Sequence, residues 1–274
     1  MQYNGCVMNA TVLSNREVKE GCRLMSLLLP PSFALPFPGQ FIMIRMKDRQ
    51  EPLLARPLSI SGFRRLREQV QVELLYRIAG RGTHLFARLG KGEKVDVSGP
   101  FGHPFEIQEE TRNIILVSGG IGIAPIRYLL SWLQASGSDF KGKIDVFMGA
   151  KTAGELLDAE TTRSFCEDLH ICTDDGSMGH PGFVTDFLEK RLASYPPGDT
   201  LICACGPAGM IRHLSEIVAR YPVACQVSLE ERMACGHGAC LGCAVAIRGR
   251  NGEKQFQRVC REGPVFDIRD ILWE

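Results

Sequence analysis

The chain has 274 residues, 45% of them apolar, so it can bury a sizeable core and is long enough for two or three domains. Its 32 basic and 31 acidic residues leave a formal net charge of +1, which favours neither a nucleic-acid partner nor a membrane surface. Because the N-terminal residues show no export signal and no stretch reaches the roughly 20 apolar residues of a membrane-spanning helix, we expect a cytoplasmic protein.

The first part of the chain, residues 1–106, predicts a small antiparallel β-barrel. Gly82 and Thr83 open a short helical pattern whose N-terminus can hold a pyrophosphate. Arg56 can contact a phosphate or a flavin edge, and Tyr76 can lie against an aromatic ring, although a solvated arginine and a core tyrosine are the commoner outcomes. Short runs with β-branched or alternating patterns and flanking turn signals predict strands at 40–46, 56–63, 69–78 and 93–102.

The second part, residues 107–221, predicts a doubly wound parallel sheet. A buried strand at 114–117 is followed by a glycine turn and an amphipathic helix that has Pro125 in its first turn. The turn lacks the complete dinucleotide fingerprint, but its glycines let phosphates approach the backbone; they are Gly119, Gly120 and Gly122. Further strands, each before a helical stretch, are expected at 143–151, 168–177 and 199–207.

Candidate ligand contacts follow two of these strands. Asp174 and Asp175 come after one, and Cys205, Gly206 and Pro207 after the other. Ligands bind at the carboxyl ends of strands in such sheets. Paired aspartates are also common turn residues, and a cysteine at a strand end is as often a buried filler.

The third part, residues 222–274, carries four cysteines at an informative spacing. Cys235, Cys240 and Cys243 read C-x4-C-x2-C, and Cys260 follows a predicted hairpin. This is the plant-type spacing for a [2Fe-2S] cluster held by four thiolates. With 11 cysteines, an odd number, and no export signal, a full disulfide framework is not expected, so the thiols are available as ligands.

Two rival metal sites fit this segment less well. A zinc ribbon usually shows two C-x2-C pairs, whereas only Cys240 and Cys243 form one here. A Rieske centre needs a second histidine ligand, but His237 is the last histidine of the chain. The glycines around the ligands suit a loop with positive φ angles that aims N–H groups at sulfur; they are Gly236, Gly238 and Gly242.

Six motifs occur in a fixed order: RPLS at 56–59, GT at 82–83, SGGIGIAP at 118–125, CGP at 205–207, SLEERMACGHGACLGC at 228–243 and VCREGPVF at 259–266. In this order the chain resembles the electron-transfer subunits of B-type dihydroorotate dehydrogenases, within the ferredoxin-NADP reductase superfamily. The resemblance runs along nearly the whole chain. Its first two thirds are shared by many flavin reductases, and the cysteine segment is the more specific part.

The resemblance implies three cofactor sites. It implies that FAD is bound by Arg56, Pro57, Leu58, Ser59, Leu75, Tyr76 and Arg77, with a pyrophosphate clamp at Gly82 and Thr83. It implies that NAD(H) contacts Gly119, Gly120, Gly122, Gly206 and Pro207, with Cys205 in a catalytic position near the nicotinamide. The implied cluster ligands are Cys235, Cys240, Cys243 and Cys260. Leu58 replaces an aromatic residue of many wider relatives, while a leucine or isoleucine fits this branch.

The resemblance also implies an oxidoreductase function. Electrons would pass from the FMN of a separate dihydroorotate dehydrogenase catalytic subunit through the [2Fe-2S] cluster and FAD to NAD+ in pyrimidine biosynthesis. The two subunits would form an α2β2 heterotetramer, with the contact placed at the small apolar surface around 233–243.

Two alternatives stay open. The small subunit of an NADH-dependent ferredoxin:NADP oxidoreductase, or of a sulfur-reducing hydrogenase, combines the same modules. A non-enzymatic metal-binding sensor or scaffold is the other, although intact Arg56, Ser59 and Gly82 argue against it. The preference between NAD and NADP is also open, because candidate phosphate contacts exist at Lys151, Thr152 and Arg163. Ordinary buried or partly buried thiols are expected at Cys6, Cys22, Cys166, Cys172, Cys203 and Cys225.

Overall fold

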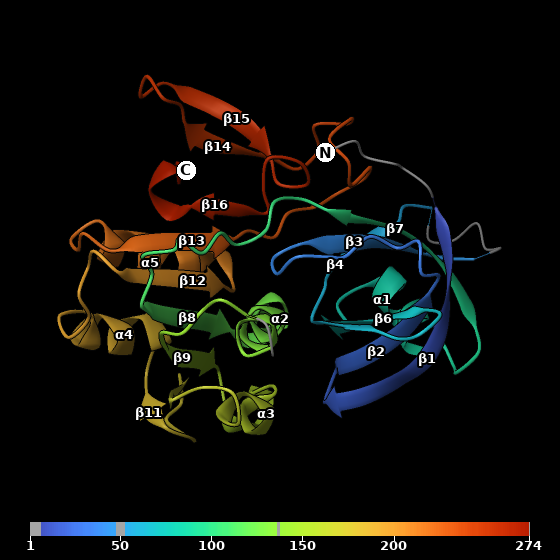
Figure 1. Ribbon diagram of the computed structural model, residues 1–274, viewed down its shortest axis with the longest axis horizontal. Helices are drawn as coiled ribbons and strands as arrows, with labels where there is room; N and C mark the ends of the chain where they lie inside the picture. Colours follow the sequence, from blue (N-terminus) through green and yellow to red (C-terminus); the bar gives the residue numbers. More distant parts are fainter. Residues whose placement is uncertain (1–6, 48–52, 136–137, 274) are drawn as a thin grey trace.

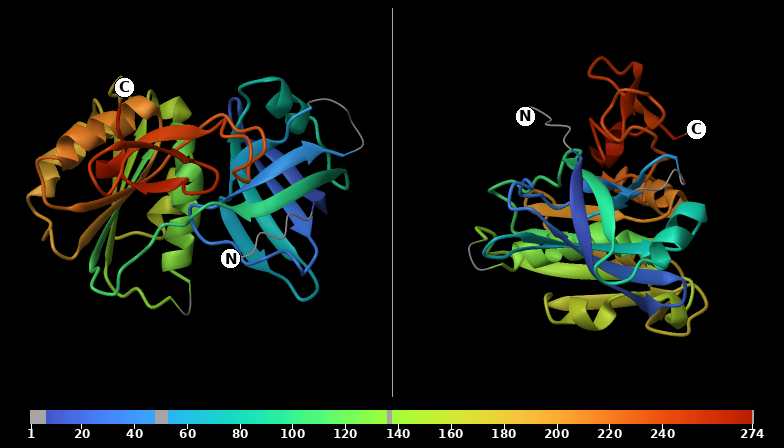
Figure 2. Two further views of the ribbon diagram at one scale, coloured as in Figure 1. Left: turned by 90° about the horizontal axis from the view of Figure 1, so that it is seen from above. Right: turned by 90° about the vertical axis from the view of Figure 1, so that its right-hand side faces the viewer.

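The computed structural model describes residues 7–47, 53–135 and 138–273. Two sheets lie side by side, and a small C-terminal hairpin lies on the second sheet and reaches toward the first (Figures 1 and 2). The helices of this described part include none that is both long and apolar enough to cross a membrane.

The N-terminal sheet is antiparallel and curls into a barrel shape (Figure 1), as the sequence predicts. Its seven strands run in the order β4-β3-β7-β1-β2-β6-β5. Every predicted run forms a strand, and the run at 56–63 forms two. The elements are β1 (Met8–Lys19), β2 (Cys22–Leu29), β3 (Phe41–Met46), β4 (Arg56–Ser59), β5 (Gly62–Arg65), β6 (Val70–Arg77), α1 (Arg81–Ala87) and β7 (Lys94–Phe101).

The second sheet has the order β11-β10-β9-β8-β12-β13-β16, with β8 to β13 parallel and β16 antiparallel to β13. One face is covered by α2 and α3 and the other by α4 and α5, which confirms a doubly wound arrangement. Its elements are β8 (Asn113–Gly119), η1 (Gly120–Gly122), α2 (Ile123–Leu133), β9 (Lys143–Ala150), η2 (Ala153–Glu155), α3 (Ala159–Arg163), β10 (Asp168–Thr173), β11 (His180–Pro181), α4 (Val184–Leu192), β12 (Thr200–Cys205), α5 (Ala208–Val218), β13 (Ala224–Ser228), β16 (Val265–Asp267) and η3 (Ile268–Asp270).

The C-terminal unit differs from the expected one at its start. The predicted boundary between 221 and 222 precedes β13, yet β13 pairs in parallel with β12 inside the second sheet. The chain leaves the sheet after Ser228, forms the cysteine loop and the hairpin of β14 (Ala244–Arg248) and β15 (Lys254–Arg258), and returns through β16. We therefore propose that the third unit begins after β13.

The cysteine loop packs against the N-terminal sheet. A Cβ atom on Gly236, whose φ is +75°, would lie 2.4 Å from Cγ of Met43 on β3. Met43, Cys243 and Cys260 also belong to one buried apolar cluster. The loop is thus held between the two sheets, close to the strands that carry the RPLS motif.

Candidate functional site

Two cavities meet beside Arg77. The first, here called the inter-sheet cavity, has a volume of about 360 Å³. The second, here called the strand-end cavity, has about 690 Å³ and opens at the carboxyl ends of the parallel strands. Arg77 lines both, so a ligand in one cavity can approach a ligand in the other.

The inter-sheet cavity collects most of the residues expected to contact a flavin. Its walls come from β4, β6, the start of α2 and the segment after β13. Of the predicted residues it contains Pro57, Leu58, Ser59, Leu75, Tyr76 and Arg77. Sequence reasoning missed Ile121, Glu230 and Met233, which line the same cavity. Glu230 and Met233 lie in the SLEERM segment at 228–233, which carries part of the family resemblance but gives no local sign of a ligand contact.

Arg56, Gly82 and Thr83 form a neighbouring group. A Cβ atom on Gly82 would lie 2.8 Å from Nε of Arg56, so the guanidinium group packs directly on the glycine. The Thr83 hydroxyl accepts hydrogen bonds from the backbone N–H groups of Ala79 and Gly80, at 2.9 and 3.1 Å. It therefore closes the turn that presents Gly82 to Arg56.

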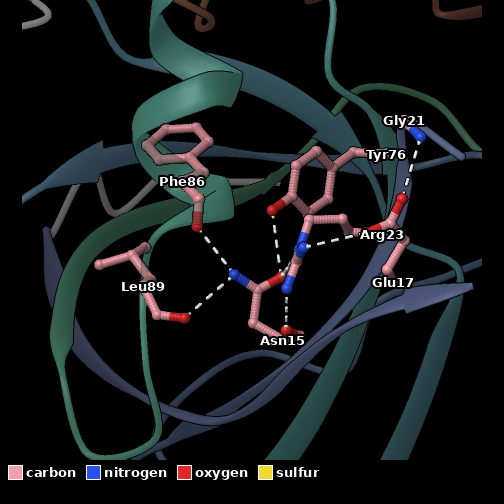
Figure 3. Close-up of polar contacts among 7 residues, drawn as sticks. All are labelled: Asn15, Glu17, Gly21, Arg23, Tyr76, Phe86 and Leu89. Atoms are coloured by element: carbon pink, nitrogen blue, oxygen red, sulfur yellow. Dashed lines mark hydrogen bonds and ion pairs between the residues drawn. The ribbon is translucent and has the colours of Figure 1, made fainter.

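The side chain of Tyr76 is buried in the core of the N-terminal sheet. Only 1% of the residue is exposed, and its hydroxyl donates to Oδ1 of Asn15 at 3.1 Å (Figure 3). Burial raises the pKa of Tyr76 to about 12, opposed by the Asn15 hydrogen bond. Asn15 in turn donates to the carbonyl oxygens of Phe86 and Leu89. The ring therefore belongs to the core of the N-terminal sheet, and contact of Tyr76 with a flavin stays a prediction.

The strand-end cavity contains part of the predicted dinucleotide site. Gly119, Gly120 and Pro207 line it. Gly122 does not: a Cβ atom there would lie 2.3 Å from the carbonyl oxygen of Cys205. Gly122 is thus required for the close approach of the turn to β12, and its contact with a phosphate stays a prediction. Gly206 is also close-packed, since its Cβ would lie 2.5 Å from Cε of Met210.

Cys205 lies at the end of β12 and is completely buried. Burial raises the pKa of its thiol, nearby Glu230 raises it further, and a hydrogen bond with Ser228 lowers it. A thiolate is therefore disfavoured here, and the side chain lines neither cavity. A catalytic role for Cys205 stays a prediction.

Charged groups line the junction of the two cavities. Nη2 of Arg77 lies 3.9 Å from Oε2 of Glu155, across the gap between the sheets. Although Glu230 is an exposed residue, desolvation raises the pKa of its carboxyl, and the Arg77 charge lowers it. Arg77, which lines both cavities, is therefore paired with Glu155 and lies near the charge of Glu230.

The four predicted cluster ligands come together as two pairs. Cys235 and Cys240 are hydrogen-bond neighbours, as are Cys243 and Cys260. Cys240 is exposed and Cys235 half-buried, whereas Cys243 and Cys260 are buried. Within the described residues no group of three or more His, Cys, Asp or Glu side chains is arranged around a single metal position. Two neighbouring pairs of thiols are the donors that the four-thiolate ligation of a [2Fe-2S] cluster requires.

The local electrostatics favour a thiolate at Cys235 and disfavour one at Cys260. Burial raises the pKa of Cys235, but backbone N–H groups of Cys240, His237 and Ala239 outweigh it and bring the pKa to about 6. The Ala239 N–H donates to Cys235 Sγ at 3.3 Å. Burial and the neighbouring Cys243 thiol raise the pKa of Cys260 to about 12. N–H groups directed at sulfur stabilise thiolates and cluster sulfur atoms alike.

The loop geometry departs from the expectation at one glycine. Gly236 and Gly238 have positive φ, at +75° and +93°, but the third positive φ, +59°, belongs to Leu241 and not to Gly242. Leu241 is also 63% exposed. A branched residue with positive φ is an uncommon conformation that stores strain and often marks a functional position.

The remaining cysteines behave mostly as ordinary thiols. Cys22, Cys172, Cys203 and Cys225 are buried, and Cys166 is half-buried. Cys6 lies outside the described residues.

Comparison with known families agrees with this geometry. Residues 230–272 match the model of the iron-sulfur cluster binding domain of dihydroorotate dehydrogenase B. Residues 116–216 match the oxidoreductase NAD-binding domain. The first match contains all four candidate ligands, and the second contains the glycine turn and the residues after β12.

Solved structures share the architecture. The chain superimposes with a TM-score of 0.82 and 27% identity on the structure from a study of an NADH-dependent reduced ferredoxin-NADP oxidoreductase, covering 98% of this chain and 91% of that one. A ferredoxin NADP+ reductase from Neisseria gonorrhoeae shares the fold at a TM-score of 0.64 and 15% identity, covering 77% and 90%.

Two curated relatives carry the same name. The dihydroorotate dehydrogenase B (NAD(+)) electron transfer subunit of Caldanaerobacter subterraneus subsp. tengcongensis is 35% identical over 97% of this chain and 98% of its own length. That of Geobacillus kaustophilus is 37% identical over 86% of each chain. The chain therefore belongs to the family of dihydroorotate dehydrogenase B electron transfer subunits.

Proposed function

We propose that this chain is the electron-transfer subunit of an NAD-dependent dihydroorotate dehydrogenase, an oxidoreductase module that acts with a dihydroorotate-oxidising partner in pyrimidine biosynthesis. The observation that carries the proposal is that the three candidate cofactor sites are neighbours. The paired cysteines pack on β3, the inter-sheet cavity lies beside them, and Arg77 joins that cavity to the strand-end cavity.

When bound, a [2Fe-2S] cluster, FAD and NAD(H) supply one-electron and two-electron transfer. The chain provides their positions. The cluster is assigned to the four cysteines, FAD to the inter-sheet cavity with Arg56 and Gly82 at its side, and NAD(H) to the strand-end cavity. Arg77 holds its cation where the flavin and nicotinamide sites meet, and the apolar walls formed by Leu58, Leu75 and Met233 limit the access of water.

We place the partner at the cluster loop. Cys240 and Leu241 are exposed, whereas their neighbours Cys243 and Cys260 are buried, so the loop offers one short route from the surface to the ligands. An exposed leucine in a strained conformation suits contact with a second protein. An FMN-containing catalytic subunit and an α2β2 heterotetramer remain predictions. A location in the cytoplasm, where thiols stay reduced, is also a prediction.

The proposal is tested on protein purified anaerobically from its own cells together with the proteins that bind it. We expect dihydroorotate and NAD+ to give NADH. If that preparation oxidises NADH with ferricyanide but forms no NADH from dihydroorotate, the reductase module stands and the assigned pathway is wrong. The likeness at a TM-score of 0.82 favours one alternative, a subunit of an NADH-dependent ferredoxin:NADP oxidoreductase. The same preparation tests it with reduced ferredoxin, NADH and NADP+ together, by the formation of NADPH.

A further inference from the structure

Two adjacent aspartates after β10 have different environments. Oδ1 of Asp175 accepts hydrogen bonds from the N–H and the hydroxyl of Ser177, at 3.0 and 2.6 Å, and so closes the turn. Asp174 lines the strand-end cavity, and only its backbone is engaged, through an N–H bond to the Ala150 carbonyl at 3.0 Å. Its exposed carboxylate has no hydrogen bond or ion pair with any other described residue.

The position of Asp174 corresponds to one end of a bound dinucleotide. The strands β8, β9 and β10 are neighbours, so the end of β10 lies about 10 Å from the glycine turn after β8. Arg77 marks the opposite end, toward the inter-sheet cavity. This step rests on the proposed function: with the nicotinamide near Arg77 and the pyrophosphate at the glycine turn, the adenosine lies at the end of β10.

The other groups at this end suit an adenosine. The Phe183 ring, in a residue that is 61% exposed, forms part of the wall just before α4. An exposed aromatic ring beside a cavity is a platform for a purine base. Among the charged residues of the wall, Glu155 faces Arg77, and Asp186 binds His213 at 2.7 Å.

Asp174 and Lys151 are the remaining charges of this wall, and neither has an ion pair within the described ranges. They follow the neighbouring strands β10 and β9, which pair through Thr173 and Ala150. One carboxylate and one ammonium group are therefore both available at the adenosine end.

We propose that Asp174 selects NAD(H) over NADP(H). Its carboxylate accepts hydrogen bonds from the adenosine ribose hydroxyls and repels a 2′-phosphate, while Phe183 holds the adenine without regard to that phosphate. Lys151 alone would favour the phosphate, and Asp174 offsets it. Lys151 is therefore the group that accepts the phosphate once Asp174 is neutralised.

The test uses the full-length holoprotein and two variants that remove the same charge one residue apart. Asp174→Asn removes the cavity carboxylate, and Asp175→Asn keeps an acceptor oxygen for Ser177. The first readout is calorimetric binding of AMP and of adenosine 2′,5′-bisphosphate. The second is the ratio of kcat/KM for NADH to that for NADPH, with ferricyanide as acceptor.

We expect Asp174→Asn to shift the ratio of the two binding affinities and the ratio of the two kcat/KM values toward the ligand that carries the 2′-phosphate, by about tenfold or more. Asp175→Asn should leave both ratios near the wild-type values. Adding Lys151→Ala to Asp174→Asn removes the gain. Phe183→Ala weakens AMP and the bisphosphate equally.

An unchanged ratio in Asp174→Asn, or an equal shift in both aspartate variants, overturns the assignment of Asp174 while NADH oxidation by the wild type keeps the proposed function. If the flavin-loaded wild type does not oxidise NADH at all, the proposed function itself is contradicted, and the inference fails with it.

Discussion

Arg127 on α2 joins the two sheets, and its replacement gives the most detailed stability prediction. Its Nη1 donates to Oε2 of Glu73 on β6 at 2.8 Å and to the Ser61 carbonyl at 3.2 Å. Its Nε lies 3.0 Å from Oδ2 of Asp158, in the segment before α3. The substitution Arg127→Met keeps an unbranched apolar stem and leaves two carboxylates without their cation.

The magnitude follows from the burial of the group. The side chains of Arg127, Glu73 and Asp158 are 22%, 26% and 20% exposed. Breaking a fully buried pair costs about 3 to 5 kcal/mol, and an exposed pair contributes roughly 0 to 1 kcal/mol. For this partly buried group we expect the free energy of unfolding to fall by about 2 kcal/mol, or roughly 30-fold in the folding equilibrium.

The pH dependence has a definite sign. Burial raises the pKa of Asp158 above its ordinary value of 3.8, and Arg127 opposes the rise. A carboxyl with a raised folded-state pKa gives stability that is present below 3.8 and lost as the pH rises through the folded-state value. Because Arg127→Met raises the pKa of Asp158 further, the substitution lowers the free energy of unfolding more at neutral pH than in mildly acidic solution.

Chemical denaturation of the wild type and of Arg127→Met, each at neutral and at mildly acidic pH, measures this loss of stability. The double variant Arg127→Met with Asp158→Asn is the control, and we expect it to recover part of the lost stability at neutral pH. An equal loss at both pH values, or no recovery in the double variant, would refute the reasoning.

Three further outcomes are expected. Gly122→Ala places a Cβ 2.3 Å from the Cys205 carbonyl oxygen and lowers the free energy of unfolding by roughly 1 to 3 kcal/mol, whereas Gly209→Ala, with open space around its Cβ, does not; denaturation decides. Arg258 donates to the Gly238 carbonyl at 2.8 Å and pairs with Glu262, so Arg258→Gln loosens the cysteine loop and speeds the loss of iron in air. Visible absorbance measures the rate of this loss, and an unchanged rate contradicts the role of Arg258. Leu241→Asp leaves the fold intact, because Asp tolerates positive φ, but weakens partner binding about tenfold or more by calorimetry, and unchanged affinity would move the docking surface elsewhere.

Much of the fold was predictable because its elements have strong local patterns. The period-two runs of β3, β6 and β7, the buried strand before the glycine turn and the hairpin β14–β15 all occur where the sequence predicts them. The spacing of the four cysteines was equally informative, since few other sites require it. By contrast, the pairing of β13 with β12, which underlies the domain boundary that we propose, was not predictable, because a five-residue strand carries no sign of the sheet that it joins.

The site was less predictable where one pattern fits two environments. Leu75 and Tyr76 are both apolar, so alternation alone does not say which of them faces the core. A glycine needed for backbone contact, such as Gly122, reads like one needed beside a phosphate. Arg77 and Glu155 meet only through the packing of the two sheets, a contact between residues that no local pattern connects.

The central claim is that electrons from the partner reach NAD+ through the four cysteines. The most direct measurement compares Cys243→Ser with Cys203→Ser, a replacement of another buried thiol, in complexes purified with the partner. For Cys243→Ser we predict loss of NADH formation from dihydroorotate, a lowered iron content and retained oxidation of NADH by ferricyanide; Cys203→Ser keeps its iron and both reactions. Undiminished NADH formation from dihydroorotate by Cys243→Ser would contradict the account.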